Sequence, residues 1–388
     1  MKTERIYDQD SHTAQCTAMV TACRAHGEGY QIALDRTCFF PEGGGQYGDR
    51  GELRTGDGAV YTVTDTQEEG DVVWHAVQRP LEVGTEVTAQ LDWSLRFARM
   101  QCHSGEHILS GLFHRLHGLD NVGFHLGDEE MTIDLSGVLT WEEIQNVERL
   151  ANRAVGENIP IMAEYPDAET LSHLDYRSKL DLTDHVRIVT IPGYDVCACC
   201  APHVKQTGEI GLIHVLSSQN WKGGVRLRVL CGSRAVEDLM EKQVLLTAIS
   251  GQLSVPQSGT AQAVERLSGA LSQAKYDYST LGKRFAKALA GTLPAGQAAL
   301  VIEELDPDGL RALVNEALAR GIPLCAAFAP AGERYTYIVG SSDTDLRPWV
   351  KEMNGALGGR GGGKPGMVQG SVAADEGSIR RWWSTLSH

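Results

Sequence analysis

The sequence lacks any apolar run approaching the roughly 20 residues that a membrane-spanning helix needs. Residues 1–15 contain no apolar stretch of the kind found in a secretory signal. We therefore expect a cytoplasmic protein without a membrane partner. Cysteine occurs nine times, an odd number spread over a long chain. This count argues against a disulfide framework and favours reduced thiols, some of which could hold a metal.

Positive charge is also in short supply. Lysine and arginine total 35 against 50 aspartates and glutamates, which gives a formal net charge of −15. Such an excess should repel a polyanion, so charge alone speaks against a nucleic-acid partner. The remaining composition, 42% hydrophobic and 22% charged, is typical of a soluble globular protein with real cores. At roughly 150 residues per domain, the 388 residues predict two or three domains.

The first part of the chain changes its hydrophobic period once. Residues 1–93 contain short alternating runs, such as 72–77, separated by glycine and aspartate turns, and this spacing predicts a small β-barrel. From residue 94 the period becomes helical, with helices expected at 96–117 and 141–155 and strands around them. Strands and helices mixed without strict alternation predict an α+β domain over 94–232.

The segment 233–291 is expected to form a long helical arm with a break near 254–259. Its second half spaces apolar residues by threes and fours, namely Val264, Leu267, Leu271, Ala274, Tyr278, Leu281 and Phe285. This a/d heptad pattern predicts a coiled coil, and therefore a homodimer through 264–285. The alternative is a helix packed on its own domain.

Residues 292–388 predict a small α/β domain. A βαβ-like unit is followed by a further strand, a helix and a glycine-dense loop at 358–366. The whole chain is thus expected to be an α+β multidomain protein: a small N-terminal β-barrel, an α+β domain, a long helical or coiled-coil arm, and a small C-terminal α/β domain.

Two histidines in the predicted helix 96–117 could bind a metal together. His103 and His107 are four residues apart, so a helix places both imidazoles on one face, one turn apart. By itself this pair is a weak signal, and the alternative is two unrelated surface histidines.

A second cluster, Cys197-Ala-Cys199-Cys200-Ala-Pro-His203, brings three thiols and an imidazole into seven residues. Cys199 and His203 form a C-x3-H pair, whereas Cys200 is a competing, three-spaced choice. Joined with the histidine pair, this cluster offers three nitrogens and one sulfur, a tetrahedral set suited to Zn²⁺. Four protein ligands usually indicate a closed structural site, whereas a catalytic zinc keeps a position open.

Three other motif matches suggest a protease, a dinucleotide site and a P-loop, and each fits less well than the metal site. His103 to His107 also reads as H-x-x-E-H, a protease signature with Glu106 as base, but that family needs a glutamate as third ligand. Gly43 to Gly48 fits G-x-G-x-x-G, yet no helix follows. Gly358 to Lys364 fits a P-loop, but Pro365 stands where a serine or threonine belongs. ATP binding is therefore not expected.

Taken together, the motifs resemble the alanyl-tRNA editing family, the free-standing relatives of the editing region of alanyl-tRNA synthetase. The resemblance spans essentially the whole chain. It is carried, in order, by Phe40-Pro-Glu-Gly-Gly-Gly-Gln-Tyr-Gly-Asp49, the H-x3-H at His103, the C-x3-H-V at Cys199 with T-G-E-I-G from Thr207, G-G-V-R-L-R-V from Gly223, and the glycine-rich 358–365 of a DHH-associated domain.

The resemblance implies hydrolysis of mischarged tRNA(Ala), either Ser- or Gly-tRNA(Ala), as translational proofreading in trans. It implies that 94–232 is a zinc-containing editing domain and that Cys199, not Cys197 or Cys200, is the thiol ligand beside His103, His107 and His203. The sequence departs from the family at Glu106 and at Cys200-Ala-Pro, where Gly-Gly-Thr is frequent. The alternative function is a tRNA-binding accessory module whose zinc is purely structural.

Further residues are candidates around this site. Glu106 could act as a base, or could be a solvated helix residue. The glycine-rich segment Gly43, Gly44, Gly45 and Gln46 could approach the pocket or tRNA, or could be a tight turn. The flanking residues Gln101, His125, Thr132 and Asp134 are expected to form only pocket wall.

A cationic surface is expected near the C-terminus. Arg360 and Lys364 flank bare glycine backbone, and Arg380-Arg381 precede two tryptophans, a combination that suits ribose phosphate. The alternative is a solvated tail with a core tryptophan pair. Because a tRNA contact needs only a local cationic face, the net charge predicts modest, salt-dependent binding and does not exclude tRNA.

Overall fold

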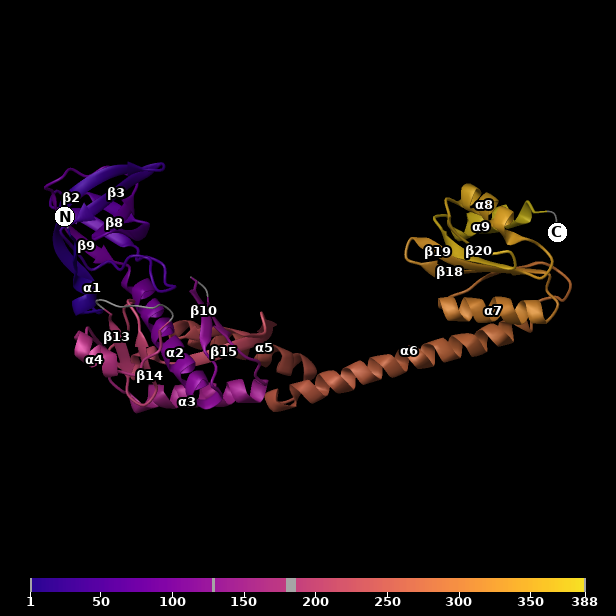
Figure 1. Ribbon diagram of the computed structural model, residues 1–388. Coiled ribbons are helices and arrows are strands. Elements are labelled where there is room, and N and C mark those ends of the chain that lie inside the picture. The colour runs from indigo at the N-terminus through magenta and orange to yellow at the C-terminus, as the bar shows by residue number, and fades with distance from the viewer. Residues whose placement is uncertain (1, 128–129, 179–185, 387–388) are drawn as a thin grey trace. The chain divides into compact units, whose positions relative to one another are not determined.

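A computed structural model describes residues 2–127, 130–178 and 186–386 (Figure 1). The chain divides into two compact units, Met1–Leu245 and Leu246–His388. Both contain helices and strands, which confirms a multidomain protein of mixed α and β structure. The four segment boundaries expected from the sequence stay predictions. Within the described residues, no helix is both long and apolar enough to cross a membrane.

The first unit begins with a seven-stranded sheet. Its strands are β2 (Gln15–His26), β3 (Gly29–Leu34), β5 (Gly51–Thr55), β6 (Val60–Val63), β7 (Asp65–Glu69), β8 (Val72–Val77) and β9 (Glu86–Leu91), ordered β6-β5-β9-β2-β3-β8-β7. The twelve-residue β2 pairs with β9 along Gln15–Met19 and with β3 from Val20 onward, with a register shift between Val20 and Ala22. One bent strand therefore joins the two halves of the sheet. Closure into a barrel stays a prediction. Outside this sheet, β1 (Glu4–Arg5) pairs in parallel with β4 (Arg36–Thr37). The short helix α1 (Ile6–Gln9) follows β1 directly.

Helix α2 (Trp93–His117) is the centre of the first unit. The side chain of Asp92 caps its first turn by accepting from the Leu95 amide, and Gly118 ends it at φ 66°. Every residue from Ala98 to Phe113 is buried, so α2 is covered on all sides. Polar side chains on this stretch must consequently find partners inside the protein, because an unpaired buried polar group is costly.

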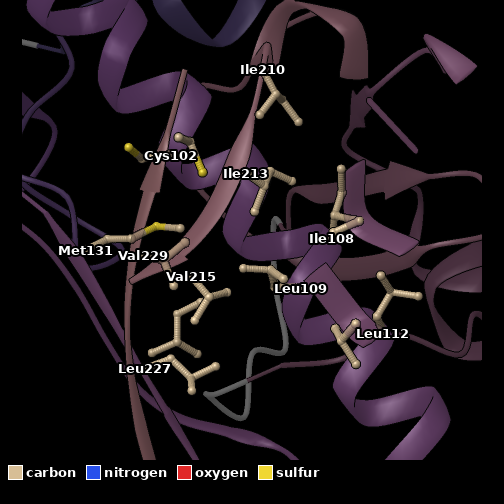
Figure 2. Close-up of a cluster of buried hydrophobic side chains, with 14 of the residues drawn as sticks. Cys102, Ile108, Leu109, Leu112, Met131, Ile210, Ile213, Val215, Leu227 and Val229 are labelled. Carbon is tan, nitrogen blue, oxygen red and sulfur yellow. The ribbon is translucent and has the colours of Figure 1, made fainter. Parts of the chain in front are cut away.

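Two layers of strands and a helix cover α2. A four-stranded sheet β10-β11-β16-β15 and a three-stranded sheet β12-β13-β14 lie in this part of the chain. Their bounds, with the helices between them, are β10 (Asn121–Leu126), β11 (Met131–Leu135), α3 (Trp141–Glu157), β12 (Met162–Glu164), α4 (Ala168–His173), β13 (Ile188–Ile191), β14 (Asp195–Ala198), the 3-10 turn η1 (Thr207–Ile210), β15 (Ile213–Trp221) and β16 (Gly224–Cys231). Apolar side chains of α2 meet those of β11, β15 and β16 in one buried cluster (Figure 2).

Two glycines on α2 allow strands to approach it closely. A Cβ at Gly105 would lie 2.5 Å from the Cys231 sulfur, and one at Gly111 would lie 2.3 Å from the Tyr194 carbonyl oxygen. Both positions therefore exclude any larger residue without a shift of the neighbouring strand. Because Gly105 and Gly111 bracket the second histidine of the H-x3-H pair, the packing at both glycines bears on its position.

The predicted helical arm is present with its break. Helix α5 (Ser233–Leu253) ends before Ser254, which has φ 53°, and a 3-10 turn η2 (Gln257–Gly259) leads into α6 (Thr260–Ala290). Six apolar members of the heptad pattern on α6 are 47–62% exposed: Val264, Leu267, Leu271, Tyr278, Leu281 and Phe285. The buried alanines at the end of α6, Ala286 and Ala290, belong to the core of the second unit.

The second unit is a five-stranded sheet with helices. It comprises β17 (Ala299–Ile302), α7 (Pro307–Ala319), β18 (Leu324–Ala331), β19 (Arg334–Ser341), α8 (Leu346–Leu357), β20 (Arg360–Lys364), β21 (Met367–Val372) and α9 (Glu376–Ser384), with strand order β17-β18-β19-β21-β20. The parallel pair β17 and β18, joined by α7, is the expected βαβ unit. The remaining pairs are antiparallel.

The expected glycine loop at 358–366 is wrong, because residues 360–364 form the edge strand β20. Two glycines of β20, Gly361 and Gly363, serve close packing here. A Cβ at Gly361 would lie 2.3 Å from both the Gln369 carbonyl oxygen and the Tyr337 hydroxyl. Only a residue without a side chain fits at position 361. Glycine here therefore indicates a strand that packs closely on a tyrosine, and does not indicate a turn.

Candidate metal centre

Four side chains from two parts of the first unit converge on one point. They are His103 and His107 of α2, and Cys199 and His203 of the loop that follows β14, with ligand atoms all within 4.8 Å of one another. The three imidazoles are buried, and Cys199 is partly buried. The Cys199 sulfur lies 3.5 Å from His103 Nε2, and the His107 and His203 ring centroids are 4.7 Å apart.

Backbone and side-chain hydrogen bonds hold the 199–203 loop in shape and to neighbouring segments. The Cys199 amide donates to the Arg187 carbonyl at 3.0 Å, and the Arg187 guanidinium donates to the carbonyls of Cys199 (3.0 Å) and Ala201 (2.8 Å). The Ser11 hydroxyl donates to the His203 carbonyl at 2.7 Å. The buried Arg187 thus bonds two carbonyls of the same loop, which fixes the spacing between Cys199 and His203.

Each imidazole uses its Nδ1 for a bond outside the cluster. His103 Nδ1 is 3.1 Å from Gln46 Oε1, His107 Nδ1 is 2.8 Å from Asp195 Oδ2, and His203 Nδ1 is 3.2 Å from Ser104 Oγ. The three Nε2 atoms are thereby left to the cluster. His203 Nε2 is buried and has no hydrogen-bond partner in the part of the chain that the structure describes.

These features fit a bound metal. Histidine ligands of metals almost always donate their other ring N–H to a carboxylate, carbonyl or similar acceptor. A buried nitrogen without a hydrogen-bond partner is otherwise costly, and a cation would satisfy it. Three nitrogens and one sulfur at this spacing match the tetrahedral N/S set that Zn²⁺ prefers, whereas Mg²⁺ and Ca²⁺ prefer oxygen.

The pKa shifts within the cluster do not all have the same direction. Burial alone would lower the pKa of His107, but its hydrogen bonds to Asp195 and Cys199 raise that pKa well above its usual value. The shifts of Cys199 and His203 suit a metal. Burial alone would raise the pKa of the Cys199 thiol, but the imidazoles of His103, His107 and His203 lower that pKa well below its usual value. Burial lowers the pKa of His203 to about 3. A thiolate and a neutral imidazole are the forms in which these side chains bind metals.

The other two cysteines of the motif point to different neighbours. The Cys200 sulfur faces the glycine-rich segment, 3.4 Å from where a Cβ on Gly44 would be. Cys197 belongs to a second group in which its sulfur, His107 and Asp195 lie within 4.8 Å of one another. The structure therefore groups Cys199 with the three histidines and places Cys197 behind His107.

The glycine-rich segment lies beside the cluster as a tight turn. Gly43 and Gln46 exchange two backbone hydrogen bonds of 3.0 Å, and Gly44 and Gly45 have φ of 60° and 80°. A Cβ at Gly45 would lie 2.8 Å from the Phe124 ring. The tight turn and the close approach to the site, posed as alternatives by the sequence, occur together here. Gln46 is fully buried, and its amide Nε2 has no partner among the described residues.

Glu106 is buried next to the cluster, with its two carboxylate oxygens in different surroundings. Oε1 accepts from Ser110 Oγ and from Asn121 Nδ2, both at 2.5 Å. Oε2 lies 3.9 Å from His107 Nε2. One oxygen is therefore held by neutral donors while the other faces the cluster.

The residues expected to form pocket wall are mostly engaged elsewhere. Gln101 donates to the Glu209 carbonyl at 2.9 Å, and Asp134 forms a bidentate pair with Arg226. His125 packs edge-on against Tyr47 at 5.5 Å between centroids. Thr132 pairs with His125 in the β10–β11 ladder. Arg360 and Lys364 lie on β20 of the second unit and are exposed.

Sequence reasoning missed most of the residues that hold the site. Of the partners of the imidazoles, Gln46 was a candidate, and Ser104 lies within the H-x3-H motif but was given no role. Asp195 and Arg187 belong to no motif that was singled out. The one available signal was an aspartate four residues before Cys199. No pattern of neighbouring residues indicates that Asp195 contacts His107, because that contact depends on how β14 packs on α2.

Comparison with known proteins identifies the family. The family model described as tRNA synthetases class II (A) matches residues 3–95, and the one described as threonyl and alanyl tRNA synthetase second additional domain matches residues 186–228. The chain is 31% identical over 278 residues to the alanyl-tRNA editing protein AlaX-L of Pyrococcus horikoshii, covering 69% of this chain and 67% of that protein. The chain belongs to the alanyl-tRNA editing protein family.

This editing-family protein also resembles full synthetases over part of their length. It is 29% identical to the alanine–tRNA ligase of Ignicoccus hospitalis over 93% of this chain, and 31% identical to that of Pyrobaculum neutrophilum over 96%. It spans 40% and 43% of those ligases. The solved C-Ala domain of Aquifex aeolicus alanyl-tRNA synthetase aligns with 24% of this chain at 20% identity and a TM-score of 0.21, too low to establish a shared fold.

Proposed function

We propose that this family member hydrolyses the ester bond of mischarged tRNA(Ala), Ser- or Gly-tRNA(Ala), acting in trans as translational proofreading. The observation that carries the proposal is the convergence of His103, His107, Cys199 and His203 within 4.8 Å. The names of its relatives, an alanyl-tRNA editing protein and alanine–tRNA ligases, supply the substrate class. Zn²⁺ is the proposed cofactor because its ligand preference matches this set.

Hydrolysis of an aminoacyl ester does not require a strong nucleophile. An aminoacyl ester is already activated, so water attack depends mainly on positioning and on stabilising charge. When bound, Zn²⁺ would supply a Lewis acid at the cluster. Beside it, the buried Gln46 side chain, whose Oε1 lies 3.1 Å from His103 Nδ1, would orient that imidazole. Glu106 Oε2, which faces His107, is the proposed general base.

The proposed tRNA contact involves one segment of each unit. Gly43, Gly44 and Gly45 present bare backbone beside the cluster, where a terminal ribose could approach. On the second unit, Arg360 and Lys364 on the exposed β20 form a local cationic surface. Such a surface on a protein of net charge −15 should bind tRNA modestly, with an affinity that falls as salt rises.

A second candidate function follows from the ligand count. Four protein ligands are typical of closed structural zinc sites. On this view the protein is a tRNA-binding accessory module, and the cluster only holds the 199–203 loop on α2. The two functions differ in turnover, since a module binds tRNA and releases no amino acid.

The deciding experiment is a deacylation assay with Ser-, Gly- and Ala-tRNA(Ala), with and without a zinc chelator. We expect release of serine or glycine and retention of alanine. Chelation should abolish the release, and added zinc should restore it. Binding of all three tRNAs without release of any amino acid would favour the accessory module.

We also propose a homodimer through the exposed heptad stripe of α6. Its members, Val264 to Phe285, are about half exposed, so a second copy could bury them in a/d register. The notable feature is a continuous apolar stripe on an otherwise polar helix, because single exposed apolar residues are common.

Two charges in the stripe should dissociate this dimer. The variant Leu271→Glu with Leu281→Glu is expected to sediment as a monomer where the wild type sediments as a dimer, since a buried unpaired carboxylate is strongly unfavourable. Ser272→Glu with Thr280→Glu adds the same charge beside the stripe and should leave the dimer intact. A wild-type protein that is monomeric at micromolar concentration would contradict the proposal.

A further inference from the structure

We propose that Asp195 is a positioning residue for His107, that Arg177 holds Asp195 in place, and that this pair sets how tightly the metal is bound. The inference rests on the proposed function, since it assumes that the cluster holds zinc. It concerns two residues outside the four ligands. Both act through His107, and neither reaches the cluster's centre.

The contacts form a chain from His107 to Arg177. His107 Nδ1 is 2.8 Å from Asp195 Oδ2, and both side chains are about 2% exposed. Arg177 donates from Nε to Asp195 Oδ1 and from Nη2 to Oδ2, each at 2.8 Å. The carboxylate is thus fixed by a bidentate, charge-assisted pair on one side and orients the imidazole on the other.

The backbone places both residues in this arrangement. Arg177 pairs with the outer edge of β14, because its amide donates to the Val196 carbonyl and its carbonyl accepts from the Ala198 amide, both at 2.9 Å. Gly111 lies one helical turn after His107, and a Cβ there would meet the Asp195 Cβ at 2.9 Å. Strand β14 can therefore lie close enough for Asp195 to reach Nδ1 only because α2 carries no side chain at that point.

A second cation at this place is the competing interpretation. His107, Asp195 and Cys197 offer ligand atoms within 4.8 Å of one another. Arg177, however, already donates to both Asp195 oxygens, so a cation would have to lie beside a fixed positive charge. His107 Nδ1 is likewise engaged by the carboxylate. The geometry therefore favours support of a ligand over a further metal site.

Zinc affinity tests the proposal directly. Zinc transfer to a chromogenic chelator should show about 10-fold weaker binding in Asp195→Asn, which keeps an acceptor without the charge, and up to about 100-fold weaker binding in Asp195→Ala. The Co²⁺-substituted variants should show shifted absorption bands, because the His107 ring is no longer held. A purely structural role for Asp195 would not move the spectrum of a folded variant.

A matched control is present in the same unit. Glu148 Oε1 is 2.8 Å from His214 Nδ1, the same carboxylate–histidine bond outside the cluster. Glu148→Gln should leave zinc affinity and the Co²⁺ spectrum unchanged. Arg177→Met should weaken zinc binding less than Asp195→Ala, and adding it to Asp195→Ala should cause no further loss, because Arg177 acts through Asp195.

The outcomes distinguish a failure of the proposed function from a failure of the role proposed for Asp195. A wild-type protein that binds no zinc would defeat the proposed function itself. A wild type that binds zinc, with Asp195→Asn and Asp195→Ala matching Glu148→Gln in affinity, would overturn the role of Asp195 and leave the function standing. If Asp195→Ala fails to fold by circular dichroism, Asp195→Asn decides alone, and wild-type affinity in that variant overturns the proposal.

Discussion

Cys199→Ala is expected to lose its zinc and, with it, all measurable release of serine from Ser-tRNA(Ala). The thiolate is the one sulfur among the four converging ligand atoms, and its removal leaves three imidazoles on a buried cluster. His107→Ala should have the same effect, because it also leaves the Asp195 carboxylate without its imidazole. Metal content by elemental analysis should fall from about one zinc per chain to none.

The neighbouring thiols are the matched controls for this result. Cys200→Ala and Cys197→Ala remove one sulfur each from the same seven-residue stretch, yet neither lies in the four-ligand group. Both should keep zinc and keep activity. An active, metal-free Cys199→Ala protein would be evidence that the metal assignment is mistaken, and a zinc-free Cys200→Ala protein would show that the ligand is Cys200.

Asp49→Ala is expected to lower the free energy of unfolding of the first unit by about 3–5 kcal/mol. Asp49 is the last residue of the motif that begins at Phe40, and its carboxylate pairs with Arg96 of α2. Both side chains are at most 2% exposed. It also accepts from the Phe40 amide at 2.6 Å. Removal of the carboxylate leaves a buried guanidinium whose remaining bonds are to carbonyls, among them Cys38 at 2.7 Å.

Urea denaturation followed by fluorescence or circular dichroism measures this effect. A suitable control is Glu69→Ala, because Glu69 pairs with Arg24 at 2.6 Å on the surface of the seven-stranded sheet. Exposed pairs contribute little, so that control should change stability by at most about 1 kcal/mol. Equal, small losses in the two variants would mean that the Arg96–Asp49 pair does not hold the segment before β5 on α2.

Prediction from sequence succeeded where the signal was local. The apolar period change near residue 94, the break at 254–259 and the βαβ unit at 299–331 all follow from the neighbours of each residue along the chain. The prediction failed at 360–364, where glycines favoured a loop. At Gly361 the reason is close approach to the Tyr337 hydroxyl of another strand, a contact at a sequence distance that no window of residues reveals.

The same distinction between local and long-range signals applies to the candidate site. The sequence by itself determined that His103 and His107 share one face of a helix, because helical periodicity is set within a single turn. It also proposed a thiol and an imidazole from 197–203, but the residues alone left the choice between Cys199 and Cys200 open.

Only the tertiary structure decided which atoms meet. The Arg187 bonds to the 199–203 loop, the glycine at 111 and the packing of β14 bring Cys199 to the histidines and Asp195 behind His107. These are contacts between segments some 80 to 100 residues apart, as in the His107–Asp195 and His103–Cys199 pairs. They depend on burial and shape complementarity around α2, which local residue preferences do not encode.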